Sequence, residues 1–77
     1  RQALWAALQR VPEAYRTVLV LADMQGLSYE EVAAIVSAPV GTVKSRLNRG
    51  RDALRELLLS QQQADPPGHR LREKEKS

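Results

Sequence analysis

Helical periodicity with three interruptions limits what this chain can fold into. Apolar residues recur every three or four positions along most of it, and Pro12, Gly26 and Pro39 break the pattern. Proline lacks the N–H that a helix interior needs, and glycine ends helices because it adopts positive φ without steric cost. No segment shows the strict alternation of a half-buried strand. The sequence therefore predicts four helices, over about 1–10, 12–25, 28–37 and 39–59.

Each predicted helix carries an apolar face that can pack against the others. The third helix also has a recognisable start, because Ser28 followed by Glu31 forms a capping-box pattern. The expected core residues are Leu4, Leu8, Val11, Tyr15, Val18, Leu19, Ala22, Val32, Ile35, Val36, Val43, Leu47, Leu54, Leu57 and Leu58, with Gly50 on the same arc of the fourth helix. A chain of 77 residues supports one core. We therefore expect an all-α fold, a small four-helix domain.

The last residues of the chain have a different composition. Residues 61–77 contain one leucine as their only large apolar residue, two prolines and charges of both signs. Such a segment cannot bury enough surface to offset the entropy lost on ordering. We therefore expect one domain over residues 1–60 and a disordered C-terminal tail over residues 61–77.

The composition argues against several kinds of chemistry. There is no cysteine, so disulfides, thiolate ligands and thiol nucleophiles are absent. The one histidine, His69, falls in the expected tail with no second metal ligand nearby. Glu30 and Glu31 are adjacent, which points them to different helix faces and prevents a catalytic carboxylate pair. We expect no enzyme activity, no metal and no cofactor.

Three further features concern the setting of the protein. No apolar run reaches the length of a membrane span, and the N-terminus lacks a signal-peptide pattern, so we expect a cytoplasmic protein without membrane contact. The chain begins at Arg1 rather than methionine, which suggests a piece of a longer protein. Trp5 lies beside the face of Leu4 and Leu8. We expect it in the core or on a partner-binding surface, since proteins that stack on single-stranded nucleic acid usually present several aromatics.

Positive charge is concentrated in one short stretch. Residues 1–43 hold three cations and four acids, whereas residues 44–51 hold four cations and no acid. This stretch falls on the fourth predicted helix, which follows a short helix across a tight turn, the layout of a helix-turn-helix. The side opposite its apolar face carries small polar and cationic groups. Such a helix fits the major groove, where arginine or lysine donates to guanine and serine or asparagine addresses several base edges.

The sequence also resembles a known family. Residues 26–58, GLSYEEVAAIVSAPVGTVKSRLNRGRDALRELL, resemble region 4 of extracytoplasmic-function (ECF) sigma factors, the promoter-specificity subunits of bacterial RNA polymerase. Residues 11–25, VPEAYRTVLVLADMQ, resemble the helix before that motif. The resemblance implies that the fourth helix reads the −35 element of double-stranded promoter DNA while the rest of the surface binds the β flap of the RNA polymerase core. Domains of this family are also commonly bound by an anti-sigma factor.

The resemblance assigns roles to individual residues. It implies base reading by Lys44, Ser45, Asn48 and Arg49, and contact near the DNA backbone by Thr42, Arg46 and Arg51. Ser28 and Tyr29 begin the preceding helix, where both can meet a phosphate. Capping by Ser28 and packing by Tyr29 are the alternative roles.

Two positions depart from the family pattern. Ser37 stands where a turn glycine is usual, so we expect local strain if the turn requires an unfavourable backbone angle. Gly50 stands where alanine is usual, which costs about 0.5 to 1 kcal/mol of helix stability. Neither position lies on the outward arc, so the expected DNA contacts are unaffected.

Two other functions stay open at this point. LuxR-type regulators also carry a TVK recognition helix, but that family typically has histidine two residues after the lysine, where this chain has Arg46. A helical protein-binding module without DNA binding is the second alternative. A salt-dependent DNA-binding assay separates such a module from a promoter reader.

Overall fold

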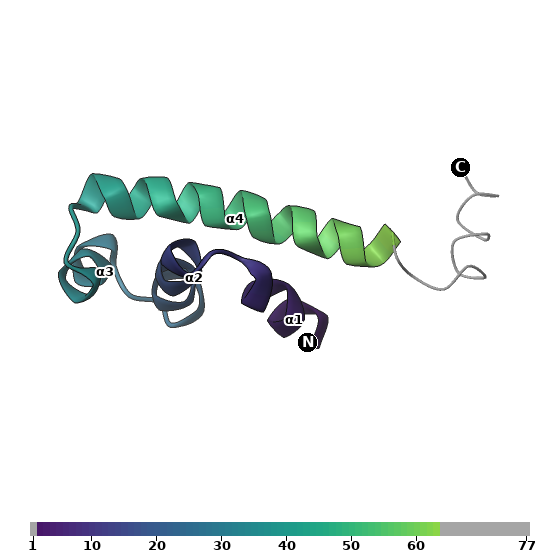
Figure 1. The fold of residues 1–77 in the computed structure, drawn as a ribbon. Coiled ribbons are helices and arrows are strands. Elements are labelled where there is room, and N and C mark those ends of the chain that lie inside the picture. The colour runs from purple at the N-terminus through teal and green to yellow at the C-terminus, as the bar shows by residue number, and fades with distance from the viewer. Residues whose placement is uncertain (1, 64–77) are drawn as a thin grey trace.

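The computed structural model describes residues 2–63, and every regular element within that range is helical (Figure 1). The elements are α1 (Gln2–Arg10), α2 (Glu13–Leu19), the π-helical segment η1 (Val20–Met24), α3 (Tyr29–Val36) and α4 (Val40–Gln63). The expected all-α, four-helix fold is confirmed. α4 continues to Gln63, past the expected domain boundary at residue 60. The rest of the expected tail, residues 64–77 with His69, lies outside the described residues.

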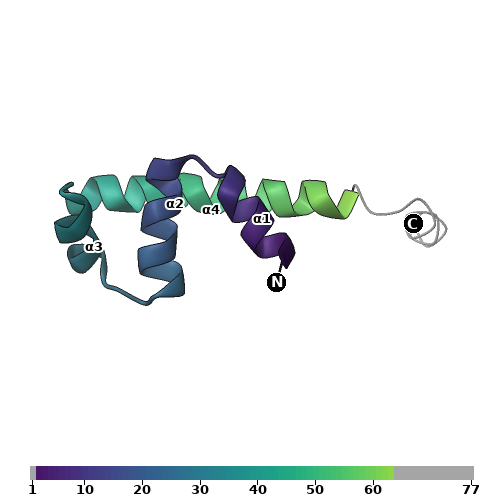
Figure 2. The ribbon, with the colours of Figure 1, turned by 60° about the horizontal axis from the view of Figure 1, so that its bottom comes forward.

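α4 is the longest of the described helices, and the other helices lie along it. α1, α2 and α3 lie along one side of it, with α3 at its N-terminal end, α2 further along and α1 beside its C-terminal half (Figure 1). Figure 2 shows the same order from a second direction. None of the other described helices covers the opposite long side of α4. Although α4 has 24 residues, neither it nor another helix between residues 2 and 63 combines the length and apolar character needed to cross a membrane.

The predicted capping box begins α3. The Ser28 Oγ accepts a hydrogen bond from the Glu31 N–H at 3.0 Å, and the Glu31 Oε1 accepts one from the Ser28 N–H at 2.8 Å. Two N–H groups that the helix start would leave unpaired are thereby satisfied. Gly26, with φ of 76°, ends the preceding helical segment close to the expected position.

The helix expected over 12–25 contains a π-helical segment. Its backbone stays helical to Met24, but η1 replaces the α-helical pattern with wider turns, as in the bond from the Gln25 N–H to the Val20 carbonyl at 2.9 Å. Each wider turn takes up about one extra residue and so rotates the following side chains relative to an α-helix. Apolar periodicity did not indicate this change.

The core is formed by aliphatic side chains from all four α-helices. Val43 and Leu47 of α4 are completely buried, as the face assignment of that helix predicts. The buried residues are Ala7, Leu8, Val11, Val18, Leu19, Val32, Ala33, Val43 and Leu47. Most other residues predicted for the core are half-buried around them.

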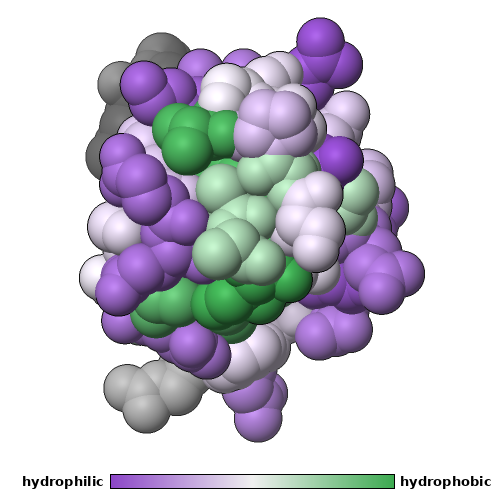
Figure 3. Space-filling view, turned by 90° about the vertical axis from the view of Figure 1, so that its left-hand side faces the viewer, coloured by the Kyte–Doolittle hydropathy of each residue, from purple (hydrophilic) through white to green (hydrophobic). Residues whose placement is uncertain are grey.

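The predicted burial of Ile35 is wrong, because its side chain is 57% exposed. α3 packs against both η1 and α4, so its buried arc centres between Val32 and Ala33, and Ile35 points away from that arc. Figure 3 shows apolar side chains gathered on the end of the molecule that carries α3, with polar groups around them.

Gly50 faces α2 at a close contact between α2 and α4. A Cβ atom at this position would stand 3.0 Å from the Leu19 Cδ1 and Cγ atoms and 3.2 Å from the Tyr15 Cβ. Distances this short require the neighbouring side chains to move. The glycine therefore permits a close helix contact, which offsets the helix propensity that it loses relative to alanine.

Candidate DNA interface

A three-residue turn joins α3 to α4. Ser37 in this turn has φ of 57° and ψ of 51°. This is a left-handed conformation that residues with a Cβ atom adopt with difficulty. The Ala33 carbonyl accepts the Ala38 N–H at 3.1 Å and also the Ser37 N–H. The positive φ that the family's usual glycine would provide is therefore required here, and Ser37 adopts it under strain.

The four candidate base-reading residues share one exposed side of α4. Lys44, Ser45, Asn48 and Arg49 are all exposed. Val43 and Leu47 are buried on the opposite side of the same helical turns. Because an α-helix rotates about 100° per residue, the exposed group spans an arc of about 140°. The predicted division of α4 into a buried and an outward side is confirmed, and base reading by these residues stays a prediction.

Tyr29 connects the start of α3 to α4. The Nζ atom of Lys44 lies 5.9 Å from the centroid of the Tyr29 ring, within range of a cation–π interaction. Tyr29 is half-buried, and Ser28 caps α3, so both structural alternatives are realised. These roles still leave polar atoms for DNA, since the Ser28 Oγ accepts its capping bond and keeps an O–H to donate.

Arg51 is paired within the domain. Its Nε donates to Oδ2 of Asp23 at 2.8 Å, and its Nη2 donates to Oδ1 at 2.7 Å, so the contact is bidentate. The hydrogen bonds from Arg51 lower the pKa of the Asp23 carboxyl below its usual value. The same bonds, with a smaller contribution from Tyr29, raise the pKa of Arg51 above its usual range. Any stability that this pair gives to the folded domain is present at pH values above the ordinary pKa of an aspartate carboxyl. It is lost as the pH falls through the lowered pKa of Asp23.

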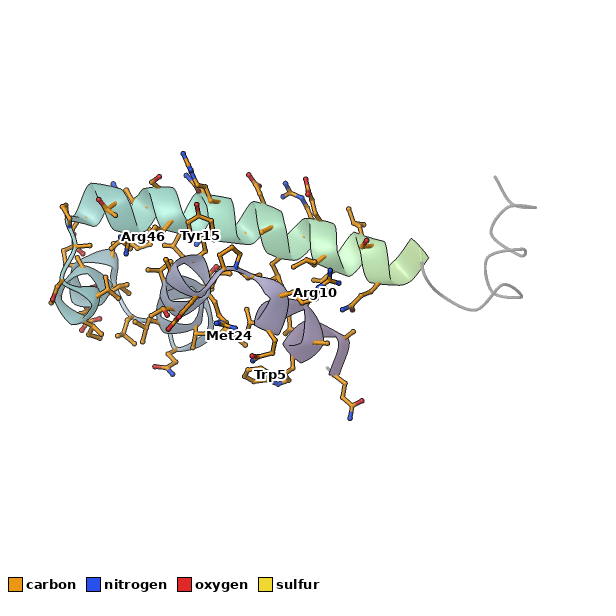
Figure 4. The ribbon with its side chains drawn as sticks, in the orientation of Figure 1. Trp5, Arg10, Tyr15, Met24 and Arg46 are labelled. Atoms are coloured by element: carbon orange, nitrogen blue, oxygen red, sulfur yellow. The ribbon has the colours of Figure 1, made fainter. Side chains whose placement is uncertain are left out.

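The remaining candidates for the DNA backbone lie at the edge of the outward side. Arg46 and Thr42 are half-buried. Arg46 projects between α2 and α3 and lines a shallow depression with Glu13 and Thr17 (Figure 4). Arg46 therefore lies at the side of α4 rather than at the centre of its outward side, and its contact with a phosphate stays a prediction.

The basic character of α4 ends after Arg51. Asp52 and Glu56 follow, and the Oδ1 of Asp52 accepts from Nη2 of Arg55 at 2.8 Å. Both side chains of that pair are about two-thirds exposed. Charges of both signs therefore occupy the outward side of the C-terminal half of α4. The part of the helix suited to a polyanion is its first three turns.

A second surface feature was not predicted from the sequence. An apolar groove of about 340 Å³ lies between α1, η1 and α4. Its lining residues are Leu4, Leu8, Leu19, Asp23, Met24, Arg51, Leu54, Arg55, Leu58 and Leu59. Helical periodicity placed most of its leucines in the core. Leu8 and Leu19 are buried there, whereas Leu4, Leu54 and Leu58 are only half-buried.

Trp5 and Met24 are large apolar side chains on the outside of the domain. Trp5 is 50% exposed and points away from α4, so the core position allowed by the sequence is wrong (Figure 4). Met24 lines the groove itself and is also exposed. Within residues 2–63 no three His, Cys, Asp or Glu side chains come together in a way that could hold a metal ion.

A capped short helix, a three-residue turn and a second helix with a basic, polar outward side define a helix-turn-helix DNA-binding domain. Residues 1–54 match the family described as Sigma-70, region 4. The chain belongs to that family, the promoter-recognition domains of sigma factors, which confirms the resemblance drawn from the sequence.

Similar full-length proteins narrow the relationship to the ECF group. The ECF RNA polymerase sigma factor SigE of Mycolicibacterium smegmatis is 49% identical over 55 residues, which cover 71% of this chain and 21% of that protein. The ECF RNA polymerase sigma-E factors of Escherichia coli K12 and Salmonella typhimurium LT2 are 46% identical over 54 residues, or 70% of this chain and 28% of each relative. The chain thus spans about a fifth to just over a quarter of the relatives' length.

Proposed function

We propose that this domain recognises the −35 element of bacterial promoters by placing the first three turns of α4 in the major groove. The observation that carries the proposal is the exposed group of Lys44, Ser45, Asn48 and Arg49, without an acid among them. These side chains offer the donors that guanine accepts and the mixed groups that other base edges use. The domain acts without catalysis and without a cofactor.

The dimensions of α4 suit this role. Residues 44–51 extend about 10 Å along the helix axis, comparable to the ~12 Å width of the major groove. The outward side has no packed neighbour among the described helices, so the duplex can approach it without rearrangement of the fold. Asp52 and Glu56 set the limit of the contact, because acids near phosphates would repel them.

Phosphate contacts would fix the orientation of α4 in the groove. Arg46 and Thr42 lie on a shoulder of the helix, where the groove wall would stand. Ser28 and Tyr29 begin α3, whose N-terminal end adds a partial positive charge toward a phosphate. These groups act on any sequence, and the base-reading residues supply the preference.

The apolar groove supports binding to RNA polymerase. We assign it to the β flap of the polymerase core, because leucine and methionine side chains line a concave surface whose α4 leucines follow the basic turns of that helix. A partner can occupy the groove while α4 contacts DNA. An anti-sigma factor that bound the same groove would compete with the polymerase. Binding to promoter DNA and to RNA polymerase would take place in the cytoplasm, which is therefore the location proposed for the domain.

Selection from a random duplex library with the 77-residue chain tests the DNA-binding proposal. We expect enrichment of one short sequence, with binding that weakens linearly in logarithmic salt concentration. Recovery of no preferred sequence at any salt concentration would favour a protein-binding module.

A pair of variants separates the two surfaces. Met24→Glu places a charge in the groove and should weaken binding to core polymerase while DNA binding remains. Arg49→Ala should weaken DNA binding while binding to core polymerase remains. Equal loss of both activities in either variant would contradict the assignment of the two surfaces.

A further inference from the structure

The Asp23–Arg51 pair combines a DNA-facing helix with an acid from outside the helix-turn-helix. Arg51 lies on the same flank of α4 as Lys44, about 20° away around the axis and about 10 Å further along it. Asp23 belongs to η1, and its Oδ1 lies 2.7 Å from Nη2 of Arg51. The acid is 28 residues from its partner in sequence.

The pair occupies one of the two edges through which the Arg51 guanidinium can bind a phosphate bidentately. Arginine recognises phosphate through two parallel N–H bonds from its planar guanidinium, and Asp23 already accepts two such bonds from Nε and Nη2. The carboxylate also cancels the charge of Arg51. In the free domain, Arg51 therefore contributes little to the positive field of α4.

The pair is nevertheless open to exchange. The Arg51 and Asp23 side chains are 43% and 36% exposed, and ion pairs at such positions are weak because water screens them. A nearby phosphate can therefore compete with Asp23 for Arg51.

We propose that Asp23 is an internal competitor for Arg51 and thereby limits the affinity of the domain for the DNA backbone. This inference rests on the DNA-binding function proposed above. Asp23 acts through Arg51 and contacts no base, so it sets general affinity and leaves sequence preference unchanged. It accordingly counts as an affinity-determining residue outside the recognition helix.

A double-mutant cycle on the 77-residue chain tests the proposal. Asp23→Asn should strengthen binding to preferred and scrambled duplexes alike, because Arg51 becomes available for one phosphate. The logarithmic salt slope should steepen by about 0.9, so the gain in affinity should shrink about 3.5-fold between 50 and 200 mM salt. In an Arg51→Gln background, Asp23→Asn should give no such gain.

A second substitution and a control complete the test. Arg51→Lys keeps the charge but cannot make the bidentate bond, so it should bind DNA at least as tightly as the wild type and with a steeper slope. Asp52→Asn removes the acid that pairs with Arg55, and its effect should be independent of Arg51. Circular dichroism establishes that each variant is folded, and Arg51→Lys supplies the test if Asp23→Asn is not.

The outcomes are distinct. The inference is overturned if Asp23→Asn binds DNA more weakly than the wild type or equally well, or if it gives the same gain in the Arg51→Gln background. In either case, DNA binding by the wild type would leave the proposed function standing. Binding by Asp23→Asn but not by the wild type supports the inference. Absence of DNA binding by both refutes the proposed function and the inference together.

Discussion

Replacement of Ser37 by glycine should stabilise the domain. The residue has φ of 57° and ψ of 51°, where the Cβ of an L-residue crowds the backbone at a cost of roughly 1 to 2 kcal/mol. Glycine removes this strain but adds about 0.4 to 1 kcal/mol of unfolded-state entropy. The Ser37 side chain is exposed, so little packing is lost. We expect a net gain of about 0.5 to 1 kcal/mol, equivalent to a rise in Tm of about 2 to 8 °C.

Thermal and urea denaturation of wild type, Ser37→Gly and Ser37→Ala measure this effect. The glycine variant should show a higher urea midpoint at an unchanged m value, since the surface exposed on unfolding stays the same. Alanine retains a Cβ and should give no gain. Equal stabilisation by alanine and glycine, or a loss with glycine, would refute the view that the turn is strained.

Three other predictions concern the core, the helix contact and the shoulder of α4. Leu47→Ala should destabilise the domain by about 2 to 5 kcal/mol, because Leu47 is completely buried, and a near-native Tm would show that the face is misassigned. Gly50→Val should cost about 1 to 3 kcal/mol by overpacking against Leu19 and Tyr15, which urea denaturation would detect. Arg46→Gln should weaken binding to all duplexes equally and reduce the salt slope by about 0.9, and an unchanged slope would remove Arg46 from the interface.

Local signals in the sequence were sufficient to place the helices. Ser28 and Glu31 cap α3 as expected, because both partners lie within one helical turn and need no distant group. The faces of α4 followed from periodicity, since a helix packed along one side buries residues on that side alone. Val43 and Leu47 on the buried side and Arg49 on the exposed side are examples.

Features that depend on how helices cross were not accessible from the sequence. The Asp23–Arg51 pair joins residues 28 positions apart, and it depends on where η1 lies relative to α4 in the folded domain. Gly50 was expected to weaken α4, whereas its effect on packing depends on the distance to Leu19. Ile35 was assigned to the core because periodicity cannot tell which side of a two-turn helix its neighbours will cover.

The central claim is that the outward side of α4 reads base edges, and Arg49 tests it most directly. Binding of the wild type, Arg49→Ala and Arg55→Ala should be compared on the selected duplex and on a scrambled duplex at equal salt. We predict that Arg49→Ala loses about 1 to 3 kcal/mol on the selected duplex and much less on the scrambled one, with relaxed preference at one base pair. Arg55 pairs with Asp52 beyond the basic turns of α4, so Arg55→Ala should leave the preference for the selected duplex intact. Equal weakening of both duplexes by Arg49→Ala would contradict base reading and assign Arg49 to a phosphate.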